Sequence, residues 1–495
     1  MLESRPGRVL AGVLVLHTAT WTLVPALVNP NLPLDVVESL TWGHAWEWGY
    51  FKHPPLSPWL AELAYSLAPG QGWPIYLLSA LCVTVAFWAV WRLARDFVAP
   101  LPAAIAVLLL EGIHYHNFSS QEFNANIVLL PFWALTILFF WRAVARARPL
   151  DWVLFGLFGA LALLGKYFAA FLIAPLGLYL LLERAGRAAW RTPGPYLALG
   201  VAMLVLAPHV VWMVGSDFAT ITYAVARSTP RGHGVIAEHV VSPAKFLFAQ
   251  AGAILPMVVL AVMLGRLRPA TGAPSRETRF LLYAGLGPLI LVVAVSAIFG
   301  LRLRSMWGAP LFLIYGLMIM TLFAPAKYHL RRFAWTWAGL FALAPSVYVA
   351  VVLAQPYVID RPKRVHFPGR ALAERVEAAW RDRFAQPLPI VVGTKWIAGN
   401  VAAYDKARPQ VYLDADPARA PWLDDATVNR VGGAAVWKRQ TSEGAASAPD
   451  SWQKRFPCLE VLPPFSLSWQ TGAQVTPLSF GWGLIAPAES CPKTK

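Results

Sequence analysis

The sequence predicts an all-helical membrane domain that crosses the bilayer many times, followed by a small α/β domain. Of the 495 residues, 57% are hydrophobic and only 14% are charged, a balance far from that of soluble globular chains. Apolar runs long enough to cross a membrane recur up to Gln355 and stop there. We therefore expect a transmembrane domain over 1–355 and a second domain over 356–495.

The first domain consists of apolar runs joined by short polar loops. A helix needs about 20 residues to cross a bilayer, and on that basis we expect about eleven spans. The first run follows Arg5 and Arg8 as in a signal peptide, but it has no clear cleavage site, so we expect an uncleaved anchor. The runs lie at 9–28, 74–94, 99–113, 126–142, 150–165, 167–183, 195–214, 245–265, 279–300, 307–324 and 333–354.

Basic residues gather in alternate loops, which predicts the topology. By the positive-inside rule these loops are cytoplasmic, so 29–73, 114–125, 215–244, 301–306 and everything after about 355 lie outside. The net charge of +16 then reflects topology and attraction to anionic lipid, and we expect no nucleic-acid partner. The basic groups are Arg5 and Arg8; Arg92 and Arg95; Arg142, Arg146 and Arg148; Arg184, Arg187 and Arg191; Arg266 through Arg279; and Lys327, Arg331 and Arg332.

The second domain shows helix and strand patterns in alternation. An amphipathic pattern predicts a helix over 371–384, and PLPIVVG and PQVYLDA predict buried strands flanking a helix near 400–404. From about 440 the chain is rich in Pro, Ser and Gly, and we expect mostly loop there. Cys458 and Cys491 lie in this tail, and the sequence does not decide whether they form a disulfide.

The first outer loop carries the most informative polar residues. Asp35 and Glu38 share one face of a helix, and Lys52-His53 precede the rigid Pro54-Pro55. A carboxylate at a helix amino terminus stays ionised and can accept the proton of an attacking hydroxyl, while the cations can balance a lipid phosphate. The alternative is a surface helix capped by Asp35, with a snorkelling lysine and an aromatic belt.

These residues and later motifs resemble glycosyltransferase family 39. LDVVE, FKHPPLSPWL, ANIVLLPFWAL and LLGKYFAAFL follow in the expected order over about 30–180, and RSMWGAP is a further landmark near 310. The resemblance implies the GT-C fold and dependence on a polyprenyl-phosphate sugar, as in protein O-mannosyltransferases and lipid A aminoarabinose transferases. Two positions depart from the family pattern: Val36 separates the two acids, and Asn126 stands where many members have an acid.

The resemblance implies a role for several residues. Asp35 matches the catalytic carboxylate or its closest partner, and Lys52 and His53 match the contact to donor phosphate. Glu38 departs from the family spacing, and we expect it to assist Asp35. Lys166 matches a further phosphate contact and Tyr167 a cavity residue, although Lys166 also fits a snorkelling lysine.

Two other outer loops carry candidate residues on their own composition. Arg302 and Arg304 lie on the outer side against the charge pattern and suit a lipid phosphate, although ordinary headgroup contact also explains them. Loop 215–244 has enough polar residues for a mobile lid over the cavity, although a solvated loop is the more ordinary interpretation, since loops are usually polar. The lid candidates are Tyr223, Arg227 and His233.

We expect no cofactor and assign no metal, because Asn126 replaces an acid; the sequence leaves metal dependence open. His114, His116 and Glu122 imitate a ligand set, but a polar loop is the better interpretation.

We expect a bacterial inner-membrane enzyme with a periplasmic carboxyl-terminal domain. It would move a sugar, with inversion, from a polyprenyl-phosphate donor to lipid A, lipopolysaccharide, another glycan or a protein. The alternatives are a flippase for a lipid-linked sugar and a non-catalytic sensor or scaffold. A transporter would place its polar groups near the bilayer midplane, whereas here they cluster in outer loops.

Overall fold

The chain forms two compact units, and the first outer loop, 29–73, contributes residues to both. The computed structural model describes residues 2–229, 232, 234–269, 273–323, 325–359, 361–439 and 450–491. We call 1–22, 52–56 and 77–348 the helical unit, and 23–51, 57–76 and 349–495 the mixed unit. The predicted domain boundary at 355/356 stays a prediction.

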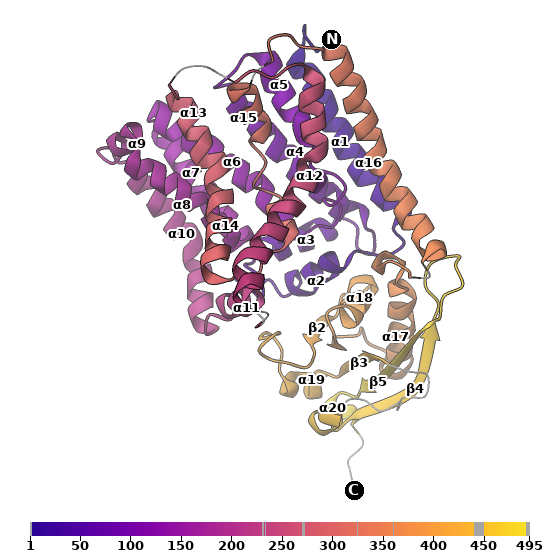
Figure 1. The fold of residues 1–495 in the computed structure, drawn as a ribbon. Coiled ribbons are helices and arrows are strands. Elements are labelled where there is room, and N and C mark those ends of the chain that lie inside the picture. The colour runs from indigo at the N-terminus through magenta and orange to yellow at the C-terminus, as the bar shows by residue number, and fades with distance from the viewer. Residues whose placement is uncertain are drawn as a thin grey trace. The chain divides into compact units, whose positions relative to one another are not determined.

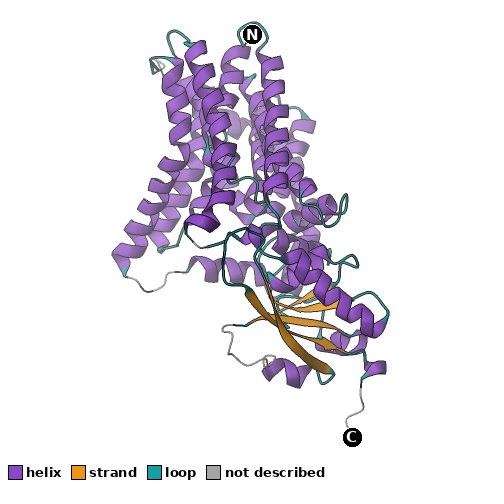
Figure 2. Cartoon of the chain, turned by 90° about the vertical axis from the view of Figure 1, so that its right-hand side faces the viewer, coloured by secondary structure: helices purple, strands orange, loops and turns teal. Residues whose placement is uncertain are grey.

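The helical unit is built from apolar helices that run side by side (Figures 1 and 2). Close packing of α7 on α10 requires Gly156, because a Cβ there would lie 2.2 Å from the carbonyl oxygen of Ala198. The helices, some of which extend beyond this unit, are α1 (Pro6–Val28), α4 (Trp73–Ala94), α5 (Pro100–Leu108), α6 (Ala125–Arg146), α7 (Pro149–Gly165), α8 (Ala170–Leu182), α9 (Arg184–Ala189), α10 (Gly194–Gly215), α11 (Ala219–Ser228), α12 (Ser242–Leu264), α13 (Arg276–Leu281), α14 (Gly287–Phe299), α15 (Tyr315–Leu322) and α16 (Leu330–Val358). Short 3₁₀ or π turns lie at η1 (Leu109–Gly112), η2 (His114–His116), η3 (Tyr167–Ala169), η4 (Ala237–Val241), η5 (Leu282–Leu286) and η6 (Ser305–Gly308).

The predicted membrane class is confirmed. Within the described ranges, 7 helices are long and apolar enough to cross a bilayer, and Pro100–Gly112, Pro149–Gly165 and Tyr167–Leu182 are shorter apolar helices. The run 307–324 differs from expectation, because only Tyr315–Leu322 is α-helical and turns occupy 309–314. Pro310 lies among these turns and lacks the amide hydrogen that a helix interior needs. The number of spans stays a prediction.

The mixed unit contains one five-stranded sheet with the order β2-β1-β3-β5-β4 (Figure 2). β1 pairs in parallel with β2 and β3, whereas β5 pairs antiparallel with β3 and β4. The strands are β1 (Ile390–Gly393), β2 (Gln410–Leu413), β3 (Gly433–Lys438), β4 (Leu459–Leu467) and β5 (Leu478–Ile485). The helices are α2 (Leu34–Gly43), α3 (Leu56–Tyr65), α17 (Gly369–Phe384), α18 (Ile397–Tyr404), α19 (Asp425–Val431) and α20 (Asp450–Arg455), with 3₁₀ turns η7 (Arg364–His366) and η8 (Ala488–Ser490).

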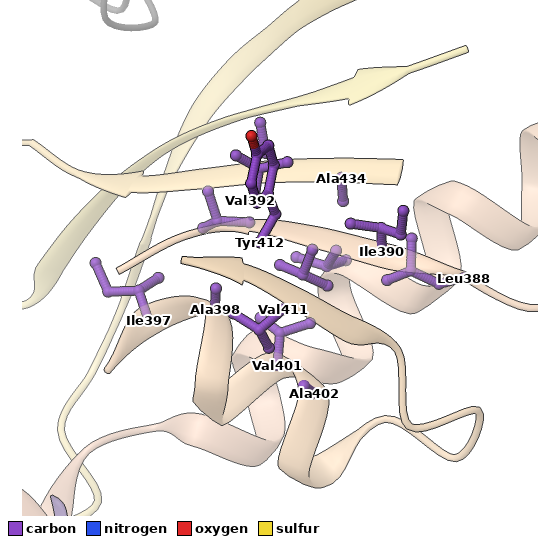
Figure 3. Close-up of a cluster of buried hydrophobic side chains, with 14 of the residues drawn as sticks. Leu388, Ile390, Val392, Ile397, Ala398, Val401, Ala402, Val411, Tyr412 and Ala434 are labelled. Atoms are coloured by element: carbon purple, nitrogen blue, oxygen red, sulfur yellow. The ribbon is translucent and has the colours of Figure 1, made fainter. Parts of the chain in front are cut away.

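The core of the mixed unit includes side chains from the first outer loop. Figure 3 shows part of it, where Val392, Tyr412 and Ala434 of three neighbouring strands lie near apolar residues of α18. Trp42 and Tyr50 belong to the same buried cluster. α2 also packs closely on α18, because a Cβ at Gly399 would lie 2.7 Å from the hydroxyl of Thr41. The loop that carries the predicted acids is therefore held by the carboxyl-terminal sheet domain.

The prediction of a mostly irregular tail after about 440 was wrong. The described part of the tail contains β4 and β5, which are the longest strands of the sheet. The prediction failed because Pro463-Pro464 argue against a strand at this point of the sequence. β4 accommodates them because it is an edge strand whose register shifts between Leu462 and Phe465. Cys458 and Cys491, which flank this hairpin, form a disulfide.

Candidate active site

Asp35 lies in the first turn of α2, where the helix dipole favours its ionised form. The amino-terminal cap is Pro33, with extended backbone angles, so the interpretation of Asp35 as the cap itself was wrong. The Asp35 side chain is half-buried, and its backbone carbonyl accepts a 2.8 Å hydrogen bond from the Ser39 hydroxyl. A half-buried carboxylate at this position can exchange protons with a bound hydroxyl.

Glu38, one turn further along α2, is held in an ion pair with Lys395. The Glu38 side chain is 4% exposed and that of Lys395 39% exposed. Lys395 follows β1, so the carboxyl-terminal domain supplies the counter-charge for an acid of the first outer loop. Burial of a carboxylate requires such a partner, since an unpaired buried charge is costly.

A second buried acid, Glu62 on α3, binds two cationic side chains. Its Oε2 accepts a 2.6 Å hydrogen bond from Arg408, and its Oε1 lies 3.1 Å from Nδ1 of His44. The Arg408 guanidinium stacks 4.6 Å from the ring centroid of Tyr65, whose hydroxyl donates to the carbonyl of Ala403. These contacts fix α3 to the end of α2 and to the loop before β2.

Lys52 and His53 group with the helical unit, whereas Asp35 and Glu38 group with the mixed unit. The side chains of Lys52 and His53 are half-buried, and each takes part in interactions within the structure.

Lys166 follows α7 and lies among aromatic rings. Its ammonium donates to Oδ1 of Asn126 and lies 5.3 Å from the Trp307 ring centroid and 5.5 Å from that of Phe168. Asn126 in turn donates from Nδ2 to Oδ1 of Asn124, the cap of α6. The amide at Asn126 thus contacts the lysine without neutralising its charge.

Tyr167 is the anchor of the predicted lid segment. Its hydroxyl lies 2.6 Å from Nε2 of His209 on α10 and 3.0 Å from Oγ1 of Thr220 on α11. α11 carries Tyr223, which is half-buried, and Arg227, which is exposed. His233 lies outside the described residues. Tyr167 therefore connects the predicted family motif to the loop between α10 and α12.

A cavity of about 450 Å³ lies beside the segment that carries Arg302. It is lined by cationic, acidic and hydroxyl side chains together with Phe246 and Val241: Arg302, Lys245, Glu238, Ser242 and Ser305. Two cations and two hydroxyls at one cavity suit a phosphate.

Hydrogen bonds hold the wall of this cavity in place. The amide of Arg302 donates to the carbonyl of Ser228, at the end of α11. The Tyr115 hydroxyl and the Gln250 amide both donate to the carbonyl of Ser305, at 2.7 and 3.1 Å. Arg304, two residues after Arg302, is half-buried and does not line the cavity.

The histidines considered as metal ligands have other contacts. His114 lies 2.7 Å from the Ser119 hydroxyl, and the ring nitrogens of His116 lie 3.1 and 3.3 Å from the carbonyls of Ala309 and Leu110. Within the described ranges, no group of three His, Cys, Asp or Glu side chains could hold a metal ion.

Residues 52–212 match the model of the family described as dolichyl-phosphate-mannose-protein mannosyltransferase. The chain is 25% identical over 271 residues to the lipid A galacturonosyltransferase RgtD of Rhizobium johnstonii, covering 53% of this chain and about half, 55%, of that protein. It is 23% identical to the lipopolysaccharide core galacturonosyltransferase RgtA of the same organism, over 96% of this chain and 97% of that protein.

The fold has a solved counterpart. ArnT from Cupriavidus metallidurans, determined bound to undecaprenyl phosphate, matches with a TM-score of 0.59 and 15% identity, over 97% of this chain and 99% of that one. The chain therefore has the GT-C fold. The predicted resemblance to glycosyltransferase family 39 is confirmed.

The chain contains polar groups that the sequence prediction missed. Lys395 and Arg408 pair with Glu38 and Glu62 across 357 and 346 residues of sequence, and no local pattern signals such partners. Lys245 had a detectable signal in the sequence, because it is the first residue of the apolar run 245–265, at the predicted outer end of that run. Arg302 has a similar position, just before the run 307–324.

Proposed function

We propose that this glycosyltransferase transfers a sugar from a polyprenyl-phosphate donor to a glycan or lipid acceptor of the bacterial envelope, with inversion at the anomeric carbon. The cavity beside Arg302 carries the proposal, because it combines two cations and two hydroxyls in a helical unit with the GT-C fold. Two relatives named galacturonosyltransferases support a uronic acid as the first sugar to test. Their names also support lipid A or the lipopolysaccharide core as the acceptor.

The reaction is a single displacement. The acceptor hydroxyl oxygen attacks the anomeric carbon and forms the new glycosidic bond, while the bond from that carbon to the phosphate oxygen breaks. The electron pair of the broken bond leaves with the polyprenyl phosphate. The hydroxyl proton passes to the carboxylate of Asp35, and Glu38 supports it on the same helix.

Cations stabilise the departing phosphate. Arg302 and Lys245 at the cavity, together with Lys52, His53, Lys166 and Arg304, are the proposed set, because charge develops on the phosphate as the bond breaks. Two aromatic rings lie within 5.5 Å of the Lys166 ammonium, which is half-buried and can attract an anion.

α11 of the helical unit serves as a lid for the acceptor in this proposal. Tyr167 holds α11 through Thr220, and the Arg302 amide holds the end of α11. Tyr223 and Arg227 of α11 would contact the acceptor from this lid, whereas the third candidate, His233, lies outside the described residues. α11 exposes the apolar side chains of Ile221 and Val225. This apolar surface suits contact with lipid or with the polyprenyl chain of the donor as α11 moves.

The mixed unit faces the periplasm in this proposal, with the chain in the inner membrane. The Cys458–Cys491 disulfide supports that side, because disulfides persist in oxidising compartments. No resident metal takes part, since Asn126 contacts Lys166 through an amide in place of an acid.

The test is sugar transfer by the purified chain in nanodiscs. Radiolabelled galacturonic acid on a polyprenyl phosphate is offered with lipopolysaccharide, and the product is analysed for label and for its anomeric configuration. Asp35→Asn should lower the turnover about 10³-fold, while Asp382→Asn, at an exposed acid of α17, should leave it unchanged.

Near-normal turnover in Asp35→Asn would remove the assigned role. A transporter would form no new glycosidic bond. Instead, it would move the labelled lipid across the bilayer when the same purified chain is reconstituted into sealed vesicles.

A further inference from the structure

Three tryptophans of the first outer loop form an exposed aromatic cluster that the proposed reaction does not use. Trp46 is 52% exposed and Trp48 is 44% exposed, although large apolar side chains are usually covered. Trp59 of α3 lies between them, with its ring centroid 4.8 Å from that of Trp48 and 6.4 Å from that of Trp46. The rings of Trp48 and Trp59 meet at 77°, so the cluster presents faces in two directions.

The backbone holds these rings in place. Trp46 has a φ of 52°, a left-handed conformation that is rare for a bulky residue and that points to a functional constraint. The indole N–H of Trp59 donates a 3.0 Å hydrogen bond to the carbonyl of Glu47. Trp42 and Tyr50, on either side in sequence, are anchored in the core of the mixed unit. The cluster is therefore fixed on a rigid support.

Polar groups lie within the same turn. Glu47 stands between the two exposed tryptophans and is half-buried, and this burial raises the pKa of its carboxyl. The Tyr50 hydroxyl is buried near the Glu47 carbonyl and the Trp59 indole, and it has no hydrogen bond of ordinary geometry within the described residues. The turn thus combines exposed ring faces with a carboxyl group that can accept hydrogen bonds.

We propose that Trp46, Trp48 and Trp59, with Glu47, bind the saccharide part of the acceptor. The C–H face of a sugar carries a slight positive charge and stacks on the negative face of an indole. The sugar hydroxyls donate to the Glu47 carboxylate. The identification of this sugar as the acceptor rests on the proposed function, whereas saccharide binding as such does not.

A bilayer surface is the less suitable occupant for this cluster. Tryptophans of an aromatic belt direct the indole N–H toward headgroups, but the N–H of Trp59 already binds a backbone carbonyl. A carboxylate among the rings is repelled by anionic lipid and is costly to place against hydrocarbon. Both features favour a neutral, hydroxyl-rich ligand.

The test measures saccharide binding without turnover. The probe is the oligosaccharide that mild acid releases from lipopolysaccharide, titrated calorimetrically into the full chain in nanodiscs. Trp46→Ala/Trp48→Ala should raise the Kd at least about tenfold, and Glu47→Gln should raise it about threefold. Trp73→Ala is the matched control: this tryptophan is 42% exposed and in the same unit, and its loss should leave the Kd within twofold.

Other outcomes separate this inference from the proposed function. An unchanged Kd in the double variant overturns the inference, even if sugar transfer is seen. Strong quenching of the wild-type fluorescence by brominated lipid, lost in the double variant, would place the rings in the bilayer and also overturn it. If the double variant loses affinity for the oligosaccharide while the wild type transfers no sugar from any polyprenyl-phosphate donor, the saccharide site is sustained and the proposed function is rejected.

Discussion

Removal of Lys395 should destabilise the mixed unit by leaving the Glu38 carboxylate buried without its cation. Loss of one partner from a fully buried ion pair costs about 3–5 kcal/mol. Because the Lys395 side chain is 39% exposed, water already screens part of the pair, and we expect about 2 kcal/mol for Lys395→Met. In a domain of 150–250 residues, this corresponds to about 4–8 °C in Tm.

The assay is thermal unfolding of the full chain in detergent, followed by tryptophan fluorescence. Glu38→Gln/Lys395→Met should recover at least half of the loss, because neither charge then remains. Arg383→Met is the matched control, since the pair of Arg383 with Glu460 is 47% and 50% exposed, and it should cost less than about 0.5 kcal/mol. Equal Tm values for Lys395→Met and the wild type would refute the reasoning.

Four further outcomes are expected. Lys245→Met and Arg302→Met should each raise the donor KM about tenfold with little change in acceptor KM, and an unchanged donor KM in both would remove the phosphate from their cavity. Burial raises the pKa of Asp405 to about 6, so its contribution to stability is present below about pH 4 and is lost as the pH rises through 6. Between pH 5 and pH 7.5 the wild type should therefore lose about 1–2 kcal/mol of stability, which Tm measurements at the two pH values can detect. Asp405→Asn should abolish that loss. Cys458→Ser/Cys491→Ser should cost about 3–4 kcal/mol on unfolding in denaturant, given their separation of 33 residues, and no loss would contradict this. Sugar transfer should be insensitive to EDTA, and inactivation that Zn²⁺ or Mg²⁺ reverses would show that a metal takes part.

Local pattern predicted the helices well, because each apolar run is long and each terminus is marked by charge or proline. α17 and α18 coincide closely with the predicted helices at 371–384 and 400–404. The hairpin of β4 and β5 was missed because Pro463, Pro464 and two glycines in β5 outweigh its apolar residues in any local measure. A bulge on an edge strand removes that conflict, and only the paired sheet reveals it.

The candidate site was partly predictable from the sequence. The placement of Asp35 at a helix amino terminus followed from Pro33 and the apolar residues after it. The partner of Glu38 did not follow, since Lys395 is 357 residues away and lies in a loop with no distinctive pattern. Charge pairs between distant segments depend on tertiary packing, which no window of sequence contains.

The joint core of Trp42, Tyr50 and the carboxyl-terminal sheet has a consequence for biosynthesis. The first outer loop leaves the ribosome hundreds of residues before β1, yet Trp42 and Tyr50 belong to a core whose other buried members come from the last part of the chain. During synthesis this loop must remain soluble and unpaired, and contacts of such sequence separation form slowly. A chain truncated after α16 would keep its membrane helices but leave α2 without a core. Such a fragment should be a substrate for envelope proteases, and its rapid degradation would reveal the order of assembly.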